Sequence, residues 1–169
     1  MKNFDEAFAH VDKLCYAPNQ WIVESVREEA QNSEYGAGRF QLNAKSVRFR
    51  VAKITPAKIG QFVAFWEKDE NNKNRAFSYD GAADLWVINT FDGDHRFGQF
   101  VFPKEVLLRQ QILRTASAKG KMAIRIYPEW ENPTSRQAVQ TQKWQLEYFV
   151  GMDTAGNFSR SKLLELYAN

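Results

Sequence analysis

The stretch from residue 84 to residue 103 reads DLWVINTFDGDHRFGQFVFP and decides the fold class. Two runs of strand-forming residues, 84–89 and 97–102, flank the tripeptide Asp92-Gly93-Asp94. An Asp-Gly step between two such runs is a strong short-range signal for a β-hairpin. The stretch therefore predicts two antiparallel strands.

More strands are predicted upstream of this hairpin. Residues 39–42 and 47–53 alternate apolar and polar side chains on either side of a short turn, which is typical of a second hairpin. Residues 60–66 are rich in strand formers and precede the polar turn 69–74. These strands belong to one mostly antiparallel sheet.

Helices are predicted around the strands from capping signals and apolar spacing. The predicted helices are 4–16, 104–114, 135–147 with Thr134 as its cap, and a short one that starts at Ser159. A further strand is predicted at 122–127. Residues 21–33 follow neither a helical nor a strand period, so the secondary structure of that segment stays open. We expect a single α/β (α+β) domain over residues 1–169, with a mostly antiparallel or mixed central sheet flanked by helices.

The composition indicates a chain that folds on its own in a reducing compartment. Of its 169 residues, 44% are hydrophobic and 14% aromatic, enough for a packed core. Cys15 is the sole cysteine, so no intramolecular disulfide forms. The sequence has neither an export signal nor an apolar run of ~18 residues, so we expect a cytoplasmic protein that does not span the membrane. The net charge of +3 permits a polyanionic partner without requiring one.

Common catalytic motifs are missing from the sequence. There is no Gly-rich phosphate loop, no Gly-x-Ser-x-Gly elbow and no His-Glu-x-x-His helix, and His10 and His95 stand in unlike contexts. Most common enzyme classes are thus unsupported.

The charged residues of the strand 47–53 are more informative. Lys53 shares the parity of the apolar residues Val47 and Val51, so it needs an acidic partner or a ligand nearby, unless it lies past the sheet edge and reaches water. Arg48 and Arg50 lie on the opposite face, where they either track phosphates or cover an exposed sheet face.

Other polar residues extend these possibilities. Lys58 and Arg125 add positive charge near the ends of elements, and a scattered phosphate-facing surface is one outcome. Glu34 and Asp84 are candidate ligands for Mg²⁺, which needs two or three acidic oxygens and a lysine nearby in phosphodiester cleavage. The helix 135–147 carries several glutamines that either read base edges or are solvated.

Several long strings of the sequence resemble the MepB-like family. The strings occupy residues 34–42, 49–63, 97–104, 121–128 and 141–146. They stand in the right order, and the resemblance covers about residues 21–150.

The order of elements is also similar to the restriction-endonuclease-like nuclease core, which places an Asp on one strand and an acidic-x-Lys on the next. Carried over to this sequence, Asp84 matches the first acid and Lys104 the lysine, but Phe102 stands where the second acid belongs. The nearest polar residue of that strand is Gln99, and Glu34 would have to supply the missing carboxylate. This likeness implies the catalytic set Glu34, Asp84 and Lys104, with Mg²⁺ as cofactor, if the protein is a nuclease.

Three functions follow from these observations. The first is a non-catalytic or weakly catalytic nucleic-acid-binding domain with a degenerate nuclease-like site. Its DNA or RNA would contact Lys53, Arg48, Arg50, Lys58, Gln99 and Arg125. The second is a metal-dependent nuclease. The third is a small-ligand or protein-interaction module linked to drug or stress response, in which tryptophans such as Trp21, Trp66 and Trp130 line a pocket. In the first two, we expect Glu34, Lys53, Asp84 and Lys104 to line one cleft.

Overall fold

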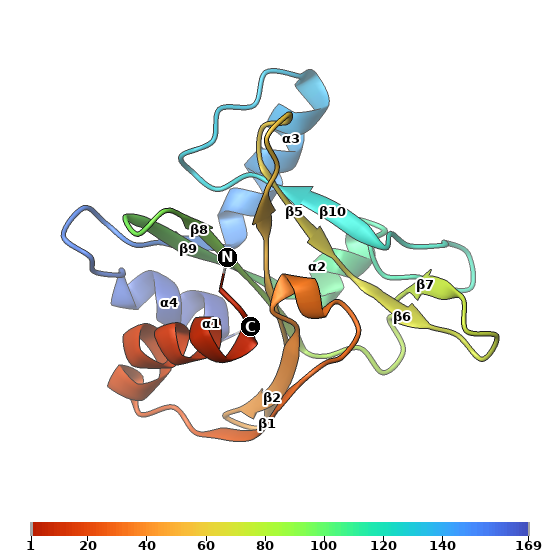
Figure 1. The fold of residues 1–169 in the computed structure, drawn as a ribbon, viewed down its shortest axis with the longest axis horizontal. Helices are drawn as coiled ribbons and strands as arrows, with labels where there is room; N and C mark the ends of the chain where they lie inside the picture. The colour runs from red at the N-terminus through yellow and green to blue at the C-terminus, as the bar shows by residue number, and fades with distance from the viewer. Residues whose placement is uncertain (1, 169) are drawn as a thin grey trace.

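The computed structural model describes residues 2–168 and has a six-stranded sheet at its centre (Figure 1). In spatial order its strands are β1 (Val23–Glu28), β2 (Gly38–Leu42), β3 (Lys45–Val51), β8 (Leu85–Asp92), β9 (Arg96–Pro103) and β11 (Phe149–Gly151). Neighbours are antiparallel except β3 and β8, which run parallel. The predicted single α+β domain with a mixed central sheet is confirmed.

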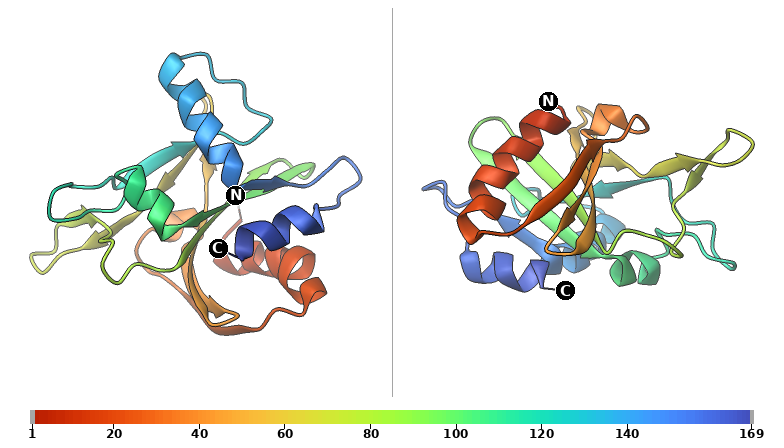
Figure 2. Two further views of the ribbon diagram at one scale, coloured as in Figure 1. Left: turned by 180° about the vertical axis from the view of Figure 1, so that it is seen from behind. Right: turned by 90° about the horizontal axis from the view of Figure 1, so that it is seen from below.

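Two smaller sheets extend this framework. The first contains β10 (Ala123–Ile126), β5 (Gln61–Ala64) and β4 (Lys53–Ile54) in the order β10-β5-β4, and all its pairs are antiparallel. The second is the hairpin of β6 (Trp66–Lys68) and β7 (Asn74–Ala76), which projects from the body of the molecule in both Figure 1 and Figure 2.

The helices lie on both faces of the central sheet. Their bounds are α1 (Phe4–Val11), continued by a π-helical turn (Asp12–Tyr16) and a 3₁₀ turn (Ala17–Asn19); a 3₁₀ turn at Ser33–Tyr35; α2 (Lys104–Arg109); α3 (Arg136–Gln145), continued by a 3₁₀ turn (Leu146–Tyr148); and α4 (Arg160–Tyr167). Helices α1 and α4 cover one face, and the β10-β5-β4 sheet with α2 covers the other (Figure 2).

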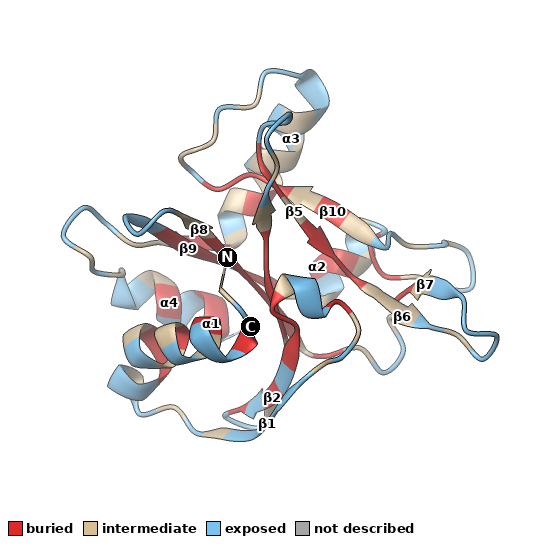
Figure 3. Cartoon of the chain, in the orientation of Figure 1, coloured by how far each residue is buried: buried red, intermediate tan, exposed pale blue. Residues whose placement is uncertain are grey.

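The central sheet therefore separates two apolar cores, and β8 and β9 are buried on both sides along most of their length, whereas β1 and alternate residues of β2 are exposed (Figure 3). In β8, Leu85 and Val87 face α1 and α4, whereas Trp86 and Ile88 face the β10-β5-β4 sheet. Alternate side chains of β8 thus enter two different cores, rather than one core and the solvent.

Local signals account for most of the element boundaries. The side chain of Ser135 accepts a hydrogen bond from the backbone N–H of Ala138, so Ser135 caps α3 rather than the predicted Thr134. Helix α2 ends at Arg109, earlier than the predicted residue 114. The open segment 21–33 contains β1, an exposed edge strand with a bulge between Glu24 and Arg27, which explains why no single period fitted it.

A buried guanidinium joins the central sheet to the β10-β5-β4 sheet. Arg50 in β3 is fully buried; its Nε donates to the carbonyl of Ala64 in β5 at 3.2 Å, and its Nη1 donates to Glu29 Oε1 at 2.9 Å. The same carboxylate lies 3.5 Å from Arg48 Nη2, and the Arg48 guanidinium stacks 3.9 Å from the ring centroid of Phe77. Burial lowers the pKa of Arg48 to about 10, so it remains charged at neutral pH. The face that carries Arg48 and Arg50 is therefore covered and not exposed.

A second buried polar chain crosses from the helices into the sheet. The Tyr167 hydroxyl is hydrogen-bonded to the Tyr16 hydroxyl at 2.8 Å and donates to Gln99 Oε1, also at 2.8 Å. Gln99 Nε2 then donates to Asn89 Oδ1, and Asn89 Nδ2 donates to the carbonyl of Arg50. Burial raises the pKa of both tyrosines, which keeps them neutral. The side chain of Gln99 is thus part of the interior.

Cys15, next to Tyr16, is also fully buried, and burial raises the pKa of its thiol to about 12. Among residues 2–168, every helix falls short of the length and apolar character needed to cross a bilayer.

We predict that Glu29→Gln lowers the free energy of unfolding by about 3–5 kcal/mol, because it leaves the Arg50 guanidinium buried without its counter-charge. Chemical denaturation measures the effect. The matched control is Glu28→Gln, one residue earlier and exposed at the end of β1, which should change stability by no more than about 0.5 kcal/mol. Equal stability of the two variants would contradict the assigned role.

A second prediction concerns pH. The His10 ring packs against Phe91 and Phe97, its Nε2 is buried without a partner, and burial together with Lys2 and Lys13 lowers its pKa from 6.5. The unfolded chain then binds a proton more readily than the folded one, so stability is lost as pH falls below about 6.5. Thermal unfolding across this range should show a shallower loss for His10→Gln. The exposed His95→Gln should match the parent, and a parent-like slope for His10→Gln would refute the assignment.

Candidate functional site

The residues expected to share one cleft lie at opposite ends of β3. Asp84 is beside the start of this strand, where its Oδ2 accepts hydrogen bonds from the backbone N–H (2.9 Å) and the hydroxyl (3.1 Å) of Ser46. Lys53 follows the other end, and its Nζ lies 3.7 Å from Glu34 Oε2. A strand advances by ~3.3 Å per residue, so the chain from Ser46 to Lys53 spans roughly 20 Å. The expected common cleft is wrong, although the acidic partner expected for Lys53 is present.

Asp84 and Lys104 are neighbours through their backbones only. The N–H of Lys104 donates to the carbonyl of Asp84 at 3.1 Å, as the strand pairing led us to expect. The Lys104 ammonium, however, lies over the ring of Tyr79, 5.3 Å from its centroid, while the Asp84 carboxylate is occupied by Ser46. The two side chains therefore do not form the expected ion pair.

These positions do not fit a magnesium site. Glu34 and Asp84 are too far apart to share one ion, and Phe102, which stands in place of the second acid, is buried in the core. Within residues 2–168, no group of three His, Cys, Asp or Glu side chains is placed to hold a metal.

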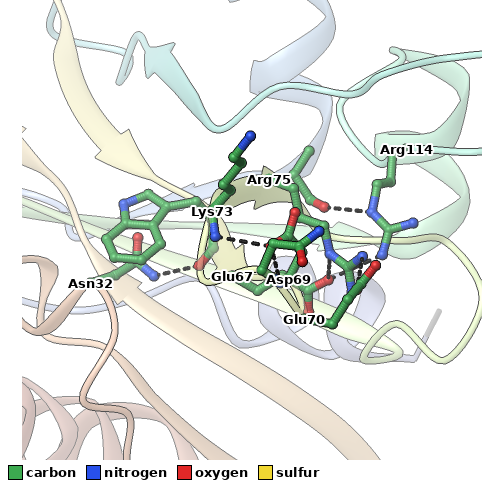
Figure 4. Close-up of polar contacts among 10 residues, drawn as sticks. Asn32, Glu67, Asp69, Glu70, Lys73, Arg75 and Arg114 are labelled. Atoms are coloured by element: carbon green, nitrogen blue, oxygen red, sulfur yellow. Dashed lines mark hydrogen bonds and ion pairs between the residues drawn. The ribbon is translucent and has the colours of Figure 1, made fainter.

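The projecting hairpin holds a cluster of charges that neutralise one another (Figure 4). Glu67 Oε2 accepts hydrogen bonds from Arg75 Nε at 2.9 Å and from Arg114 Nη2 at 3.1 Å, and Glu70 lies 3.7 Å from Arg75. In the turn, Asp69 accepts backbone hydrogen bonds that lower its pKa. Because Arg75 is paired within the hairpin and Arg114, from the segment after α2, is paired with Glu67, this cluster serves the structure of the hairpin first.

The outer face of the β10-β5-β4 sheet carries four side chains in sequence across the strands, which we call the basic–aromatic row: Lys53, Tyr35, Phe62 and Arg125. Lys53 Nζ lies 4.6 Å from the centroid of the Tyr35 ring, and the Tyr35 and Phe62 centroids are 6.1 Å apart. The Arg125 guanidinium lies 5.8 Å from the Phe62 centroid. Cations thus bracket two aromatic rings on a face that is partly open to solvent.

Strand register builds this row. Phe62 pairs with Lys53 in β4 and with Arg125 in β10, so the three side chains point to the same face. Gln61 and Val63, on either side of Phe62, are fully buried against the central sheet, whereas Phe62 is half-buried. Tyr35 reaches the row from the 3₁₀ turn that precedes β2.

Arg125 also orders the loop between β4 and β5. Its Nη1 donates to the hydroxyl of Thr55 at 2.9 Å and to the carbonyls of Ile59 and Gly60, both at 3.2 Å. Lys58 lies exposed in the same loop. The loop therefore presents a further cation beside the row.

The electrostatics of the row favour an anionic ligand. Glu34 is the acid next to it, and its side chain is 78% exposed, so its pair with Lys53 is weak and easily exchanged for another anion. Burial and the charge of Glu34 raise the pKa of Tyr35, whose hydroxyl therefore remains a neutral hydrogen-bond donor.

The row lies between two clefts. One, of about 620 Å³, adjoins Lys53 at the carboxyl ends of β3 and β8. The other, of about 490 Å³, adjoins Arg125 and lies between β10 and α3. The tryptophans considered for a ligand pocket are dispersed: Trp21 lines a small cleft near Tyr167, Trp66 is on the projecting hairpin, and Trp130 packs against Phe149.

The structure thus divides the binding residues predicted from sequence into two groups. Lys53, Lys58 and Arg125 gather on the outer face of the β10-β5-β4 sheet, while Arg48, Arg50 and Gln99 belong to the interior. Sequence reasoning missed Tyr35 and Phe62. The one signal in the sequence was that Phe62 and Val63, as neighbours on a strand, point to opposite faces of the sheet. This alternation alone does not show which of the two faces is open to solvent.

Known proteins resemble this chain over most of its length. The family model described as MepB-like matches residues 29–151, a span that contains the whole basic–aromatic row. A crystal structure titled as that of MepB is 38% identical, covers 88% of this chain and 97% of its own, and has a TM-score of 0.77. No match was found among curated proteins.

We predict that Asp84→Ala lowers the free energy of unfolding by about 1–3 kcal/mol, because the N–H and hydroxyl of Ser46 lose their acceptor. Urea denaturation measures the change. The exposed Asp80→Ala, in the loop just before, serves as control and should stay within about 0.5 kcal/mol of the parent. If Asp84→Ala left the free energy of unfolding unchanged, a functional role for this carboxylate would have to be considered again.

Proposed function

Because this chain belongs to the MepB-like family, we propose that it is a nucleic-acid-binding member of that family and that the basic–aromatic row is its contact surface. The observation that carries the proposal is the alternation of charge and ring across one open sheet face: Lys53, Tyr35, Phe62, Arg125.

The chemistry of the row matches the two parts of a nucleotide. Ring faces such as those of Tyr35 and Phe62 stack with bases, at ~1–3 kcal/mol per base, whatever the base is. Lys53, Lys58 and Arg125 supply cations for the phosphates between the bases. A three-stranded sheet face with central aromatic residues is a surface on which bases can lie flat.

The row favours a single strand over a duplex. In a duplex the base faces are stacked on one another and only their edges are accessible, so the rings of Tyr35 and Phe62 would find no partner. Because stacking on a ring and pairing with a phosphate do not depend on the sugar, the proposal covers single-stranded DNA and RNA alike. The net charge of +3 supports moderate affinity with strong dependence on salt.

We predict that fluorescence anisotropy with a labelled oligothymidine shows binding at low salt that weakens as salt rises. Phe62→Ala should weaken binding about tenfold or more, because a stacked base is lost. Lys53→Gln should reduce the slope of log affinity against log salt by about one phosphate contact.

The control for charge is Lys13→Gln, an exposed lysine of the turn after α1, which should bind like the parent. Thermal unfolding of each variant separates loss of contact from loss of fold. The proposal would be rejected if the oligothymidine did not bind at low salt, or if its affinity changed neither with salt nor with Phe62→Ala.

A further inference from the structure

The outer edge of β10 is covered by a side chain instead of a strand. In the order β10-β5-β4, β10 has a neighbouring strand on one side only. On the other side, Gln145 of α3 accepts a hydrogen bond from the N–H of Tyr127 at 2.9 Å and donates one to the carbonyl of Arg125 at 3.0 Å. Its amide thus makes the two bonds that a neighbouring strand would make there.

The rest of this edge remains uncovered. The carbonyl of Met122 accepts a hydrogen bond from the N–H of Phe65, the residue directly after β5. In the antiparallel register of β10 with β5, the even-numbered residues of β10 therefore bond to β5, and the backbone groups of the odd-numbered residues point outward. Gln145 occupies the N–H of Tyr127 and the carbonyl of Arg125, in agreement with this pattern. The N–H of Arg125 and both backbone groups of Ala123 therefore face outward, and nothing in residues 2–168 is seen to pair with them.

A cleft of about 490 Å³ runs beside these groups. Gln145 and Trp144 of α3 line it together with Gln110 and Ile112, which follow α2. Lys121 and Arg125 are the charged residues among those that line it, and no described Asp or Glu is. The cleft is therefore a positively charged slot alongside an open strand edge.

We propose that an extended, acidic peptide segment of a partner protein binds in this cleft as a fourth strand next to β10. The exposed edge alternates donors and acceptors, which is the pattern that a second peptide backbone satisfies. A phosphodiester chain offers acceptors but no donor, so it would leave the carbonyl of Ala123 unpaired. The exposed Lys121 selects acidic side chains on the added strand.

This site is distinct from the surface proposed for nucleic acid. The added strand uses the backbone N–H of Arg125 and the edge of β10, whereas the nucleic acid uses the guanidinium and the face of the sheet.

The first test uses a blocked hexapeptide, Ac-Glu-Val-Glu-Val-Glu-Val-NH₂, and hydrogen exchange of the folded protein followed by NMR. Without peptide, the amides of Ala123 and Arg125 should exchange faster than those of Ile124 and Ile126. With peptide, the first two should slow and shift. A counterpart with Lys in place of Glu should bind more weakly, and one N-methylated at alternate residues should not bind.

The second test changes the edge itself. Ala123→Pro removes an outward N–H while leaving the ladder to β5 intact, so peptide affinity should fall about tenfold or more. Ala123→Val keeps the N–H and should bind like the parent, and unchanged melting temperatures would show that both variants fold. Phe62→Ala should leave peptide binding intact, which separates this proposal from the nucleic-acid surface.

Three results would overturn the proposal: no binding of the acidic peptide at millimolar concentration, equal binding of the N-methylated peptide, or parent-like affinity in a folded Ala123→Pro. Protection of the Ala123 and Arg125 amides by oligothymidine in place of the peptide would also overturn it and would assign the edge to nucleic acid.

Discussion

The structure depends on how one permanent charge is satisfied in its interior. Arg50 is fully buried between the central sheet and the β10-β5-β4 sheet, and its guanidinium bonds to Glu29, the residue directly after β1, and to the carbonyl of Ala64 in β5. Unpaired, such a charge would cost several kcal/mol, so β1 and β5 are both held at fixed positions relative to β3. Ala64 is two residues from Phe62 on the same strand. The geometry of the basic–aromatic row therefore follows from a contact on the hidden side of the sheet that carries it.

The division of the molecule into layers determines which surfaces remain open to a ligand. Helices α1 and α4 bury one face of the central sheet, and the β10-β5-β4 sheet buries the other, so β8 and β9 at the middle of the central sheet offer no open face (Figure 3). The β10-β5-β4 sheet, in contrast, has one face against the core and one partly exposed, and one of its edges opens into a cleft. Its face and its edge present different chemistry, rings with cations in one case and backbone groups in the other. The two binding surfaces that we propose therefore use different atoms of this sheet.

Local patterns in the sequence predicted local structure well, but they could not predict which strands distant in the sequence pair with each other. The Asp92-Gly93 turn fixed β8 and β9; Lys53 has an acid nearby, Glu34, but it also lies past the end of β3 with a partly exposed side chain, which was the alternative interpretation of its parity. The parallel pairing of β3 with β8, and the passage of the chain from β3 into another sheet after Val51, depend on contacts between distant segments. For that reason Arg48 and Arg50 were placed on the right face of their strand without any indication that a second sheet covers it. The backbones of Asp84 and Lys104 are neighbours, as the strand pairing predicted. The Asp84 carboxylate, however, accepts a hydrogen bond from Ser46, and no local pattern in the sequence indicated that contact.

The buried Cys15 gives the protein a built-in chemical reporter. A thiol pKa of about 12 leaves only on the order of one thiolate in 10⁵ at pH 7, and the sulfur has no access to solvent in the folded state. A thiol reagent therefore reacts only when this region opens, at a rate set by the opening equilibrium. Because the neighbouring Tyr16 is hydrogen-bonded to Tyr167 of α4, that opening requires the two ends of the chain to separate. Labelling kinetics of the natural, unmutated chain would thus measure how firmly its terminal helices are joined.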